Sequence, residues 1–493
     1  MNTAPSRTLA LSRPGARPGT RVGAWLSRLR EWGAAGWPVL LVSVIGLALR
    51  IDYAISFDGP HRGADYERHY SGVYWMIHNW RPFFYTPEVN WTINYQGPLW
   101  YMAAGVLFLI FHAEKAATSI AVVGWAVRQI LLHRVLLQAI PHRRWTILLA
   151  MSIAAFLPIS VDGDSIINPE GLHSSLFWVA AYFLWRMERE AQRPVGISLW
   201  TGAFFGIFAG LGALTKATSG VLPIALALML IWQVRGARSN GDTWRTIWRH
   251  LGVPAVVAGL AWCCVAGWYC GPNIINYGHP FPHAWDLSPP PNTPEMTLPL
   301  LSRRPLGWAL PFYWKHYLTE PIQQWYLFPT PNLWAQYIVG AWSDITNRGN
   351  CRLEGGGVFT KYFDGHPVSG RCLEFYSALA RIGVFTTVVT IGCVFSTLWR
   401  HLRSRGAQGS LVLPLLAVLV VFFAAMFTLI YPIDGMVSTN TRYILSSAAP
   451  MSACLGIGLS EIERPLLRKI LTAATGVAVT AIGVLYVYTR WGV

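Results

Sequence analysis

Residues 196–235 read GISLWTGAFFGIFAGLGALTKATSGVLPIALALMLIWQVR, and this stretch decides the fold of the chain. It contains two apolar runs, 196–214 and 218–235, and each approaches the roughly 20 residues that a helix needs to cross a bilayer. Lys216 lies between the two runs, and Arg235 ends the second one. The stretch therefore predicts two membrane-spanning helices joined by a tight turn that carries a cation.

The composition of the whole chain extends this prediction. Hydrophobic residues make up 53% of the 493 residues and charged residues only 13%, whereas an ordinary soluble domain has about 25% charged residues. Too few charges remain to cover the surface of a water-soluble core of this size. The sequence therefore predicts an all-α polytopic membrane protein and argues against a soluble enzyme or a disordered chain.

Apolar runs recur along the chain and predict about 11 transmembrane helices in total. The short apolar stretch 97–112 predicts a helix that lies against the membrane or dips into it, rather than a span. Besides the two runs above, we expect spans at 36–54, 116–138, 145–161, 171–187, 251–270, 377–399, 409–431, 442–461 and 468–489.

The distribution of Arg and Lys orients these helices. A net charge of +16 is compatible with nucleic-acid binding, but it is also expected when basic residues gather in cytoplasmic loops of a membrane protein. With 97–112 left out of the count, the basic tail 1–35 and the short loops with clustered Arg all fall on one side. We therefore place the N-terminus in the cytoplasm, expect the tail to be disordered, and expect no nucleic-acid partner.

This orientation also defines the expected domain organisation. A transmembrane core over 36–270 includes an outer segment at 55–115, a second outer segment occupies 271–376, and C-terminal helices follow over 377–493. The many Trp residues of the second outer segment are typical of the membrane interface, with sugar stacking by one or two of them as the alternative. Cys351 and Cys372 share this segment and could form a disulfide in an oxidising compartment.

Ionisable residues gather at the outer ends of the predicted helices. If residues 64–80 form a helix, Asp65 and His69 face the same way, and such a pair can deprotonate a hydroxyl or help to hold a divalent cation. Asp162 and Asp164 lie in the connection between two later spans, on the same side. Either cluster could be a solvated loop or a polar turn, but ionisable groups this close to lipid usually mark function.

Two isolated cations are expected on the same side of the membrane. Lys216 is surrounded by hydroxyl residues, and Arg442 begins a span, with Tyr443 next to it. A cation beside hydroxyl groups suits a phosphate, although either side chain could instead extend toward lipid headgroups. Carboxylates that activate a hydroxyl, together with cations that bind a phosphate, are what a transferase with a lipid-phosphate donor requires.

Several of these stretches resemble motifs of a known superfamily. They are Asp65-Tyr66-Glu67-Arg68-His69, followed by Asn94-Tyr95-Gln96-Gly97-Pro98-Leu99-Trp100-Tyr101, and then Asn168-Pro169-Glu170-Gly171, Leu214-Thr215-Lys216 and Thr441-Arg442-Tyr443-Ile444-Leu445. In their order and spacing they resemble the GT-C superfamily of integral-membrane glycosyltransferases. Within it, the likeness is to the group of the protein O-mannosyltransferases, the lipid A aminoarabinose transferase and many bacterial transferases of the dolichyl-phosphate-mannose type.

The resemblance implies an inverting transfer of a sugar from a polyprenyl-phosphate donor to a lipid, glycan or protein acceptor. The expected location is the outer face of a bacterial inner membrane. Asp65 matches the general base of the superfamily. Many members have a contiguous Asp-Glu pair at this point, whereas Glu67 here follows one residue later and is a further acidic candidate. The second acidic site of the superfamily matches Asp162 or Asp164.

The resemblance also assigns residues to the donor and to a metal. Lys216 and Arg442, with Tyr443, match the residues near the donor phosphate. Some members of the superfamily use a divalent metal such as Mg or Mn, and others do not. The candidate ligands for such a metal in this chain are His69 and Asp164.

Two other functions fit the same membrane layout. A transporter or flippase of a lipid-linked sugar would have ionisable groups near the middle of the membrane and two repeated halves, whereas few charges such as Arg128 lie within the predicted spans. An O-antigen polymerase or ligase would favour Arg-rich outer loops without an acidic first loop. The sequence shows no clear inverted repeat, which argues against the transporter. The clusters around Asp65 and around Asp162 and Asp164 argue against the polymerase or ligase.

Overall fold

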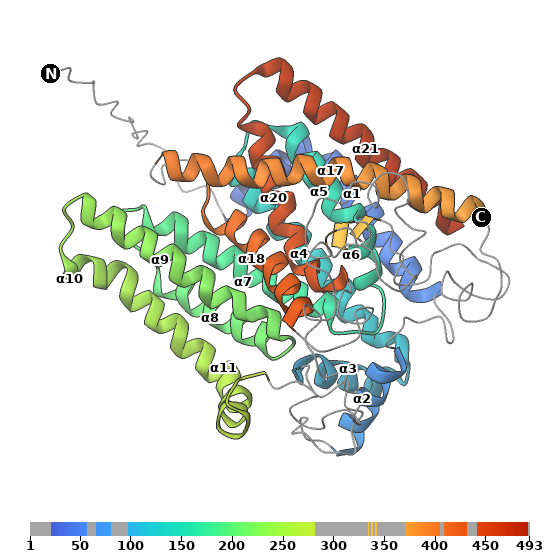
Figure 1. Cartoon of the computed structure of the whole chain (residues 1–493), viewed down its shortest axis with the longest axis horizontal. Coiled ribbons are helices and arrows are strands. Elements are labelled where there is room, and N and C mark those ends of the chain that lie inside the picture. Colours follow the sequence, from blue (N-terminus) through green and yellow to red (C-terminus); the bar gives the residue numbers. More distant parts are fainter. Residues whose placement is uncertain are drawn as a thin grey trace.

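The computed structural model describes residues 21–56, 66–79, 97–281, 334, 337–338, 341–342, 370–404, 409–430 and 441–491 of the chain. Every regular element within these ranges is a helix, which confirms the predicted all-α class. Figure 1 shows a bundle in which α8 and α11 run side by side, while α17 and α21 lie together along one flank.

The first part of the chain supplies most of the bundle. Its longer helices are α1 (Arg21–Ser56), α2 (Tyr66–Asn79), α3 (Leu99–Phe111), α4 (Thr118–Ala139), α5 (Arg144–Phe156), α7 (Glu170–Ala191), α8 (Leu199–Ala213), α9 (Val221–Ser239) and α11 (Val253–Tyr277). Short helical segments join them, namely η2 (Glu114–Ala117), α6 (Pro158–Gly163), η3 (Ala217–Gly220), α10 (Trp244–Ile247) and η4 (Trp248–Gly252).

The C-terminal part adds further helices to the same bundle. They are α17 (Gly370–Arg403), α18 (Val412–Ile430), η8 (Thr441–Ser447), α20 (Ala448–Ser460) and α21 (Pro465–Trp491). Helix α20 packs against α17, α5 and α18, so the last part of the chain closes onto helices from the first part.

The predicted spans all coincide with helices. In the described part of the chain, 6 helical stretches are long and apolar enough to cross a membrane, namely Gly36–Ser56, Glu114–Ala139, Ala217–Ser239, Trp244–Tyr277, Ser377–Arg403 and Pro465–Val487. Shorter apolar helices account for the other predicted spans apart from 171–187, which lies in α7. These findings support an integral membrane protein, while the count of 11 stays a prediction. The stretch 97–112 is also helical, as α3.

Helix α7 occupies the centre of the bundle although it carries several charges. It packs against α4, α8 and α18, and the side chains of Phe177, Trp178 and Trp185 are buried in the main apolar core. The charged residues of α7 are confined to its two ends, with Glu170 at the start and Glu188 near the finish. This distribution keeps the ionisable groups away from the middle of the membrane-spanning region, where they are most expensive.

The two ends of α7 give names to the two ends of the bundle. The Lys216 end is the side where α7 begins, and it includes residues 97–101, 158–175, 214–220 and 441–447. The Glu188 end is the side where α7 finishes, and it includes residues 186–201 and 400–412. Figure 1 shows α2 and α3 at the first of these ends and α10 far from them, at the other.

Helix α8 approaches α11 closely because a stripe of glycines lines its contact face. Gly202, Gly206 and Gly210 recur at every fourth position, and a Cβ atom on Gly206 would overlap the backbone carbonyl of Ala258. In lipid, small residues at such an interface allow two helix backbones to pack directly against each other. The stripe therefore permits the close packing of α8, the helix that precedes Lys216, against α11.

Candidate active site

The start of α7 is held by its own sequence. Pro158 occupies the first turn of α6, where its missing N–H group is no loss, and the short helix ends at Gly163. The chain then turns, and the Asn168 side chain accepts a hydrogen bond from the backbone N–H of Glu170 at 2.9 Å. The Asn-Pro-Glu-Gly motif thus shapes the entry into α7 and places Glu170 in its first turn.

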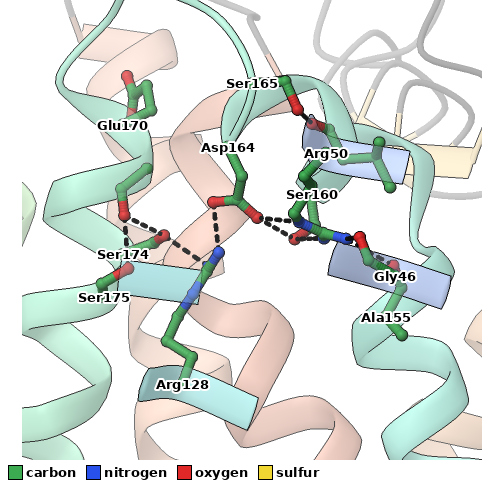
Figure 2. A network of polar contacts seen from close by, with 12 residues as sticks. Gly46, Arg50, Arg128, Ala155, Ser160, Asp164, Ser165, Glu170, Ser174 and Ser175 are labelled. Carbon is green, nitrogen blue, oxygen red and sulfur yellow. Dashed lines mark hydrogen bonds and ion pairs between the residues drawn. The ribbon is translucent and has the colours of Figure 1, made fainter. Parts of the chain in front are cut away.

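Asp164, at the end of α6, lies at the centre of a buried ionic network (Figure 2). Its Oδ2 accepts hydrogen bonds from Arg50 Nε at 3.0 Å and from Ser160 Oγ at 2.9 Å, and its Oδ1 is bonded to Arg128 Nη2. Arg128 also donates to Ser174 Oγ at 2.6 Å. The network therefore ties helices α1, α4, α6 and α7 together through their side chains.

The two guanidinium groups are held by further contacts. Arg50 donates through Nη1 to the carbonyl oxygens of Gly46 at 3.0 Å and Ala155 at 2.9 Å, and it lies 4.1 Å from the centre of the Trp125 ring. The Arg50 and Asp164 side chains are fully buried. A buried charge is tolerated only when it is paired and hydrogen-bonded in this way.

The network bears on the predicted metal site. Both Asp164 oxygens are already bonded to guanidinium groups, which occupy the positions that a divalent cation would need. His69 bonds through Nδ1 to the hydroxyl of Tyr101 at 2.9 Å. Within the described ranges, no group of three or more His, Cys, Asp or Glu side chains is placed to hold a metal ion. In this structure both Asp164 oxygens are engaged by arginines. A divalent metal bound by His69 and Asp164 stays a prediction.

Lys216 forms a buried ion pair with Glu170. Its ammonium group contacts Glu170 Oε1, and only 7% and 8% of the two side chains are exposed. Lys216 precedes η3 in an extended conformation, with φ −159° and ψ 143°, and its N–H bonds to the carbonyl of Gly212 at 2.9 Å. The predicted phosphate-binding cation is thus buried and paired with a carboxylate.

His173 fixes the loop on either side of Lys216. Its Nδ1 lies 3.2 Å from Thr215 Oγ1, and its Nε2 lies 2.6 Å from Thr218 Oγ1. The imidazole therefore bridges the two threonines that flank the lysine, and it does so from one helical turn beyond Glu170. Helix α7 supplies both the partner of Lys216 and the support of its loop.

The backbone at the start of α3 is hydrogen-bonded to the loop that carries Lys216. The N–H groups of Gly97 and Leu99 donate to the carbonyls of Thr215 at 3.2 Å and Leu214 at 2.9 Å. A Cβ atom on Gly97 would overlap the Leu214 carbonyl, so only glycine permits this approach. Two of the stretches that carry the GT-C resemblance are therefore in direct contact.

The remaining stretches lie against these segments. His69 of α2 bonds to Tyr101 of α3, and Ile167 packs in the same apolar cluster as Trp100 and Tyr101. A Cβ atom on Gly163 would meet the Leu445 side chain at 2.8 Å, which places η8 against the turn of α6. The described parts of these stretches thus meet at the Lys216 end.

Several predicted site residues cannot be placed. Asp65 and Cys351 lie outside the described residues, and so do the side chains of Glu67, Cys372, Arg442 and Tyr443, although the backbone of the last four is helical. Asp162 is described and is buried on α6. The catalytic roles of Asp65, Glu67 and Asp162 stay predictions. The same holds for phosphate binding by Arg442 and Tyr443 and for the disulfide between Cys351 and Cys372.

The sequence prediction gave no role to three residues that the structure places at this end, namely Arg50, His173 and Glu170, although Glu170 lies in one of the motif stretches. Arg50 lies inside a predicted span, as Arg128 does, and an ionisable residue within a span is itself a sign of a functional or structural partner. Glu170 and His173 lie one helical turn apart, so they share a face of α7. This spacing was the sequence feature that could have identified Glu170 and His173 as members of one site.

Comparison with known proteins identifies the fold. No protein-family model matches the chain, and a search by sequence finds no significant match among curated proteins. The structure is similar to the apo oligosaccharyltransferase of Archaeoglobus fulgidus, with a TM-score of 0.52 and 14% identity over 92% of this chain and 56% of that one. ArnT from Cupriavidus metallidurans, bound to undecaprenyl phosphate, gives a TM-score of 0.49 and 13% identity over 89% and 63%.

These findings concern the fold of the chain. The chain has the fold of the GT-C membrane glycosyltransferases, as the resemblance of its motifs predicted. It spans 56% to 63% of the length of the two solved proteins named above. At this level of identity the likeness concerns the fold, and the particular activity has to be argued from the site.

Proposed function

We propose that the protein is a glycosyltransferase that moves a sugar from a polyprenyl-phosphate donor to an acceptor hydroxyl. The observation that carries this proposal is the meeting of the motif stretches around a buried Lys216 at one end of a GT-C bundle. An anionic donor needs a cation there, and the acidic candidates are carried by the neighbouring segments. The proposed donor has a carrier lipid of the same chemical class as the undecaprenyl phosphate that is bound to ArnT.

In this mechanism each residue has a chemical task. Lys216, with Arg442 and Tyr443, binds the donor phosphate and stabilises the charge that develops as the phosphate leaves. Asp65 removes the proton from the acceptor hydroxyl, whose oxygen then attacks the anomeric carbon from the face opposite the phosphate. The glycosidic bond to phosphate breaks, the configuration inverts, and the leaving phosphate is already ionised, so it needs no general acid.

The acidic residues of α6 have separate roles in this proposal. Asp164 acts as a structural anchor, because both of its oxygens are bonded to Arg50 and Arg128. Asp162 is then the better candidate for the second acidic site of the superfamily. No step of the proposed reaction passes through a metal ion.

We also propose the orientation that the basic loops predict. The Lys216 end faces the outside of a bacterial inner membrane, and the N-terminus is cytoplasmic. The segment 271–376 would cover the site and select a lipid, glycan or protein acceptor. Among these acceptor classes the described residues favour none.

The proposal is tested with purified protein in detergent and a polyprenyl-phosphate-linked sugar. A transferase releases free polyprenyl phosphate, whereas a transporter or flippase returns the donor unchanged. The variant Asp65→Asn should lose activity by about 10³-fold, within the range measured for general bases, while it elutes from size exclusion like the wild-type protein. Activity close to wild type in this variant would overturn the role of Asp65.

A further inference from the structure

The proposed mechanism leaves Glu170 without a task, although this residue is buried beside the proposed phosphate site. Among the described residues, its carboxylate has Lys216 as its sole partner. The other buried carboxylates of α7 are bonded quite differently. Glu188 accepts from Ser410 Oγ and from the Leu411 N–H, both at 2.6 Å. The Glu170 carboxylate is therefore held by one lysine side chain and by no backbone donor in these ranges.

In the described part of the chain, Lys216 and Glu170 pair one positive with one negative charge. The ion pair of Lys216 and Glu170 is neutral and buried, with no more than 8% of either side chain exposed. A phosphate arriving at Lys216 would place a second negative charge next to the carboxylate, in surroundings that screen charge poorly. Either anion is stable on this ammonium group, but both together repel each other.

The neighbouring segments hold donors that the carboxylate does not use. Asn168 Nδ2, Ser219 Oγ and Trp100 Nε1 are buried and have no hydrogen-bond partner in the described part of the chain. Asn168 Oδ1 is fixed on the Glu170 N–H, so its amide nitrogen is directed elsewhere. Buried donors without acceptors are rare because they are costly. A phosphate brings more acceptor oxygens than a carboxylate and could satisfy them.

We propose that Glu170 occupies the anion position on Lys216 until the donor arrives, and that the donor phosphate then replaces it. Asn168 Nδ2 and Ser219 Oγ donate hydrogen bonds to the phosphate once it is bound. After transfer, the returning carboxylate helps to expel the polyprenyl phosphate. This inference rests on the proposed function, because it takes the ligand of Lys216 to be the donor phosphate.

The test compares the affinity of Glu170→Gln and wild-type protein for a polyprenyl phosphate in detergent. The amide keeps the size of the side chain but removes the negative charge that competes with the phosphate for Lys216. Because the phosphate no longer has to break a charged hydrogen bond between Lys216 and residue 170, the Kd should fall about tenfold. The donor KM should fall with it. The same ligand should raise the melting temperature of this variant more than that of wild type. Weaker or unchanged binding would overturn the inference, because a purely structural Glu170 predicts that result.

Asn168→Asp gives the opposite test. The new carboxylate still accepts the Glu170 N–H, but it exchanges the amide donors for a negative charge. The Kd for polyprenyl phosphate should therefore rise about tenfold, the effect of losing one hydrogen bond to a charged group. An unchanged Kd would overturn the role given to Asn168.

Glu190→Gln, which removes a buried charge at the other end of α7, is the matched control and should leave the Kd unchanged.

A double variant separates this inference from the proposed function. Lys216→Met combined with Glu170→Gln removes both charges and leaves neither one buried alone. If the double variant binds polyprenyl phosphate like wild type, the phosphate does not bind at Lys216 and the donor site of the proposed function fails. If it loses binding while Glu170→Gln alone binds no tighter than wild type, the replacement of Glu170 fails and the donor site stands.

Discussion

The two ends of helix α7 use buried carboxylates in different ways. At the Glu188 end, Glu188 and Glu190 accept hydrogen bonds from backbone N–H groups and hydroxyls, and Glu190 also from Arg186 at 2.8 Å. At the Lys216 end, Glu170 is paired with Lys216 and Asp164 with two arginines. Carboxylates that cap backbone groups hold the fold, and Asp164 holds it through two arginines and Ser160. Glu170 differs from all of these because its carboxylate has a single lysine as its partner among the described residues.

The details at the Glu188 end agree with a structural role. Glu188 binds the N–H of Leu411, one of the free donors at the start of α18, and so joins α7 to that helix. Glu190 accepts from the N–H of Ser198 at 3.1 Å, directly before α8. A ligand that displaced either carboxylate would leave a helix terminus without a partner.

The largest effect should follow from Asp164→Asn. The amide leaves Arg50 and Arg128 buried without an anion, and breaking a buried ion pair from one side costs about 3–5 kcal/mol of unfolding free energy. Most of the protein should be lost on detergent extraction, or its melting temperature should fall sharply. Adding Arg128→Gln restores the original net charge and should recover part of the loss. If the Asp164→Asn variant is as stable as wild type, the network does not stabilise the fold.

Gly97→Ala should have an intermediate effect. The added methyl group would overlap the Leu214 carbonyl and push the Lys216 loop away, at about 1–3 kcal/mol of stability. Donor KM should rise, because Lys216 moves with the loop. Gly259→Ala is the matched control, since a Cβ there meets nothing within 4 Å. Equal behaviour of the two variants would show that the approach of Gly97 to the loop is unimportant.

Glu188→Gln should lower the free energy of unfolding less than Asp164→Asn or Gly97→Ala does. The amide oxygen can still accept the Leu411 N–H, so the expected loss is about 1 kcal/mol, seen as a small fall in melting temperature. The Kd for polyprenyl phosphate should not change. A change in that Kd as large as in Glu170→Gln would abolish the distinction between the two ends.

Glu463→Gln should have the smallest effect. This side chain is 91% exposed and lies 3.6 Å from Arg400 at the Glu188 end, and exposed ion pairs contribute about 0–1 kcal/mol. Stability and donor affinity should both match wild type within error. If donor affinity shifts as it does in Glu170→Gln, overall charge rather than the local ion pair controls binding.

The sequence predicted the helices well and the site only in part. Hydrophobic runs near 20 residues report directly on bilayer thickness, so the positions of the spans followed from composition. The stretches around Lys216 and Asp164 were predicted to share one side, and they do meet. Orientation relative to the membrane and the roles of Asp65 and Arg442 remain predictions.

The ion pairs of the site were not predictable from the sequence. Arg50 and Asp164 are 114 residues apart, and Lys216 and Glu170 are 46 apart. Which cation meets which carboxylate depends on how helices pack, and that depends on features such as the α8 glycines. The sequence accordingly assigned Asp164 to catalysis or metal binding, while the structure shows its two oxygens engaged by arginines.

The most direct test of the central claim is a structure of the protein with a bound polyprenyl phosphate. The account predicts phosphate density within hydrogen-bond distance of Lys216 Nζ, with the Glu170 carboxylate displaced and the Asp164 network unchanged. Phosphate density elsewhere, with the pair of Lys216 and Glu170 intact, would contradict it.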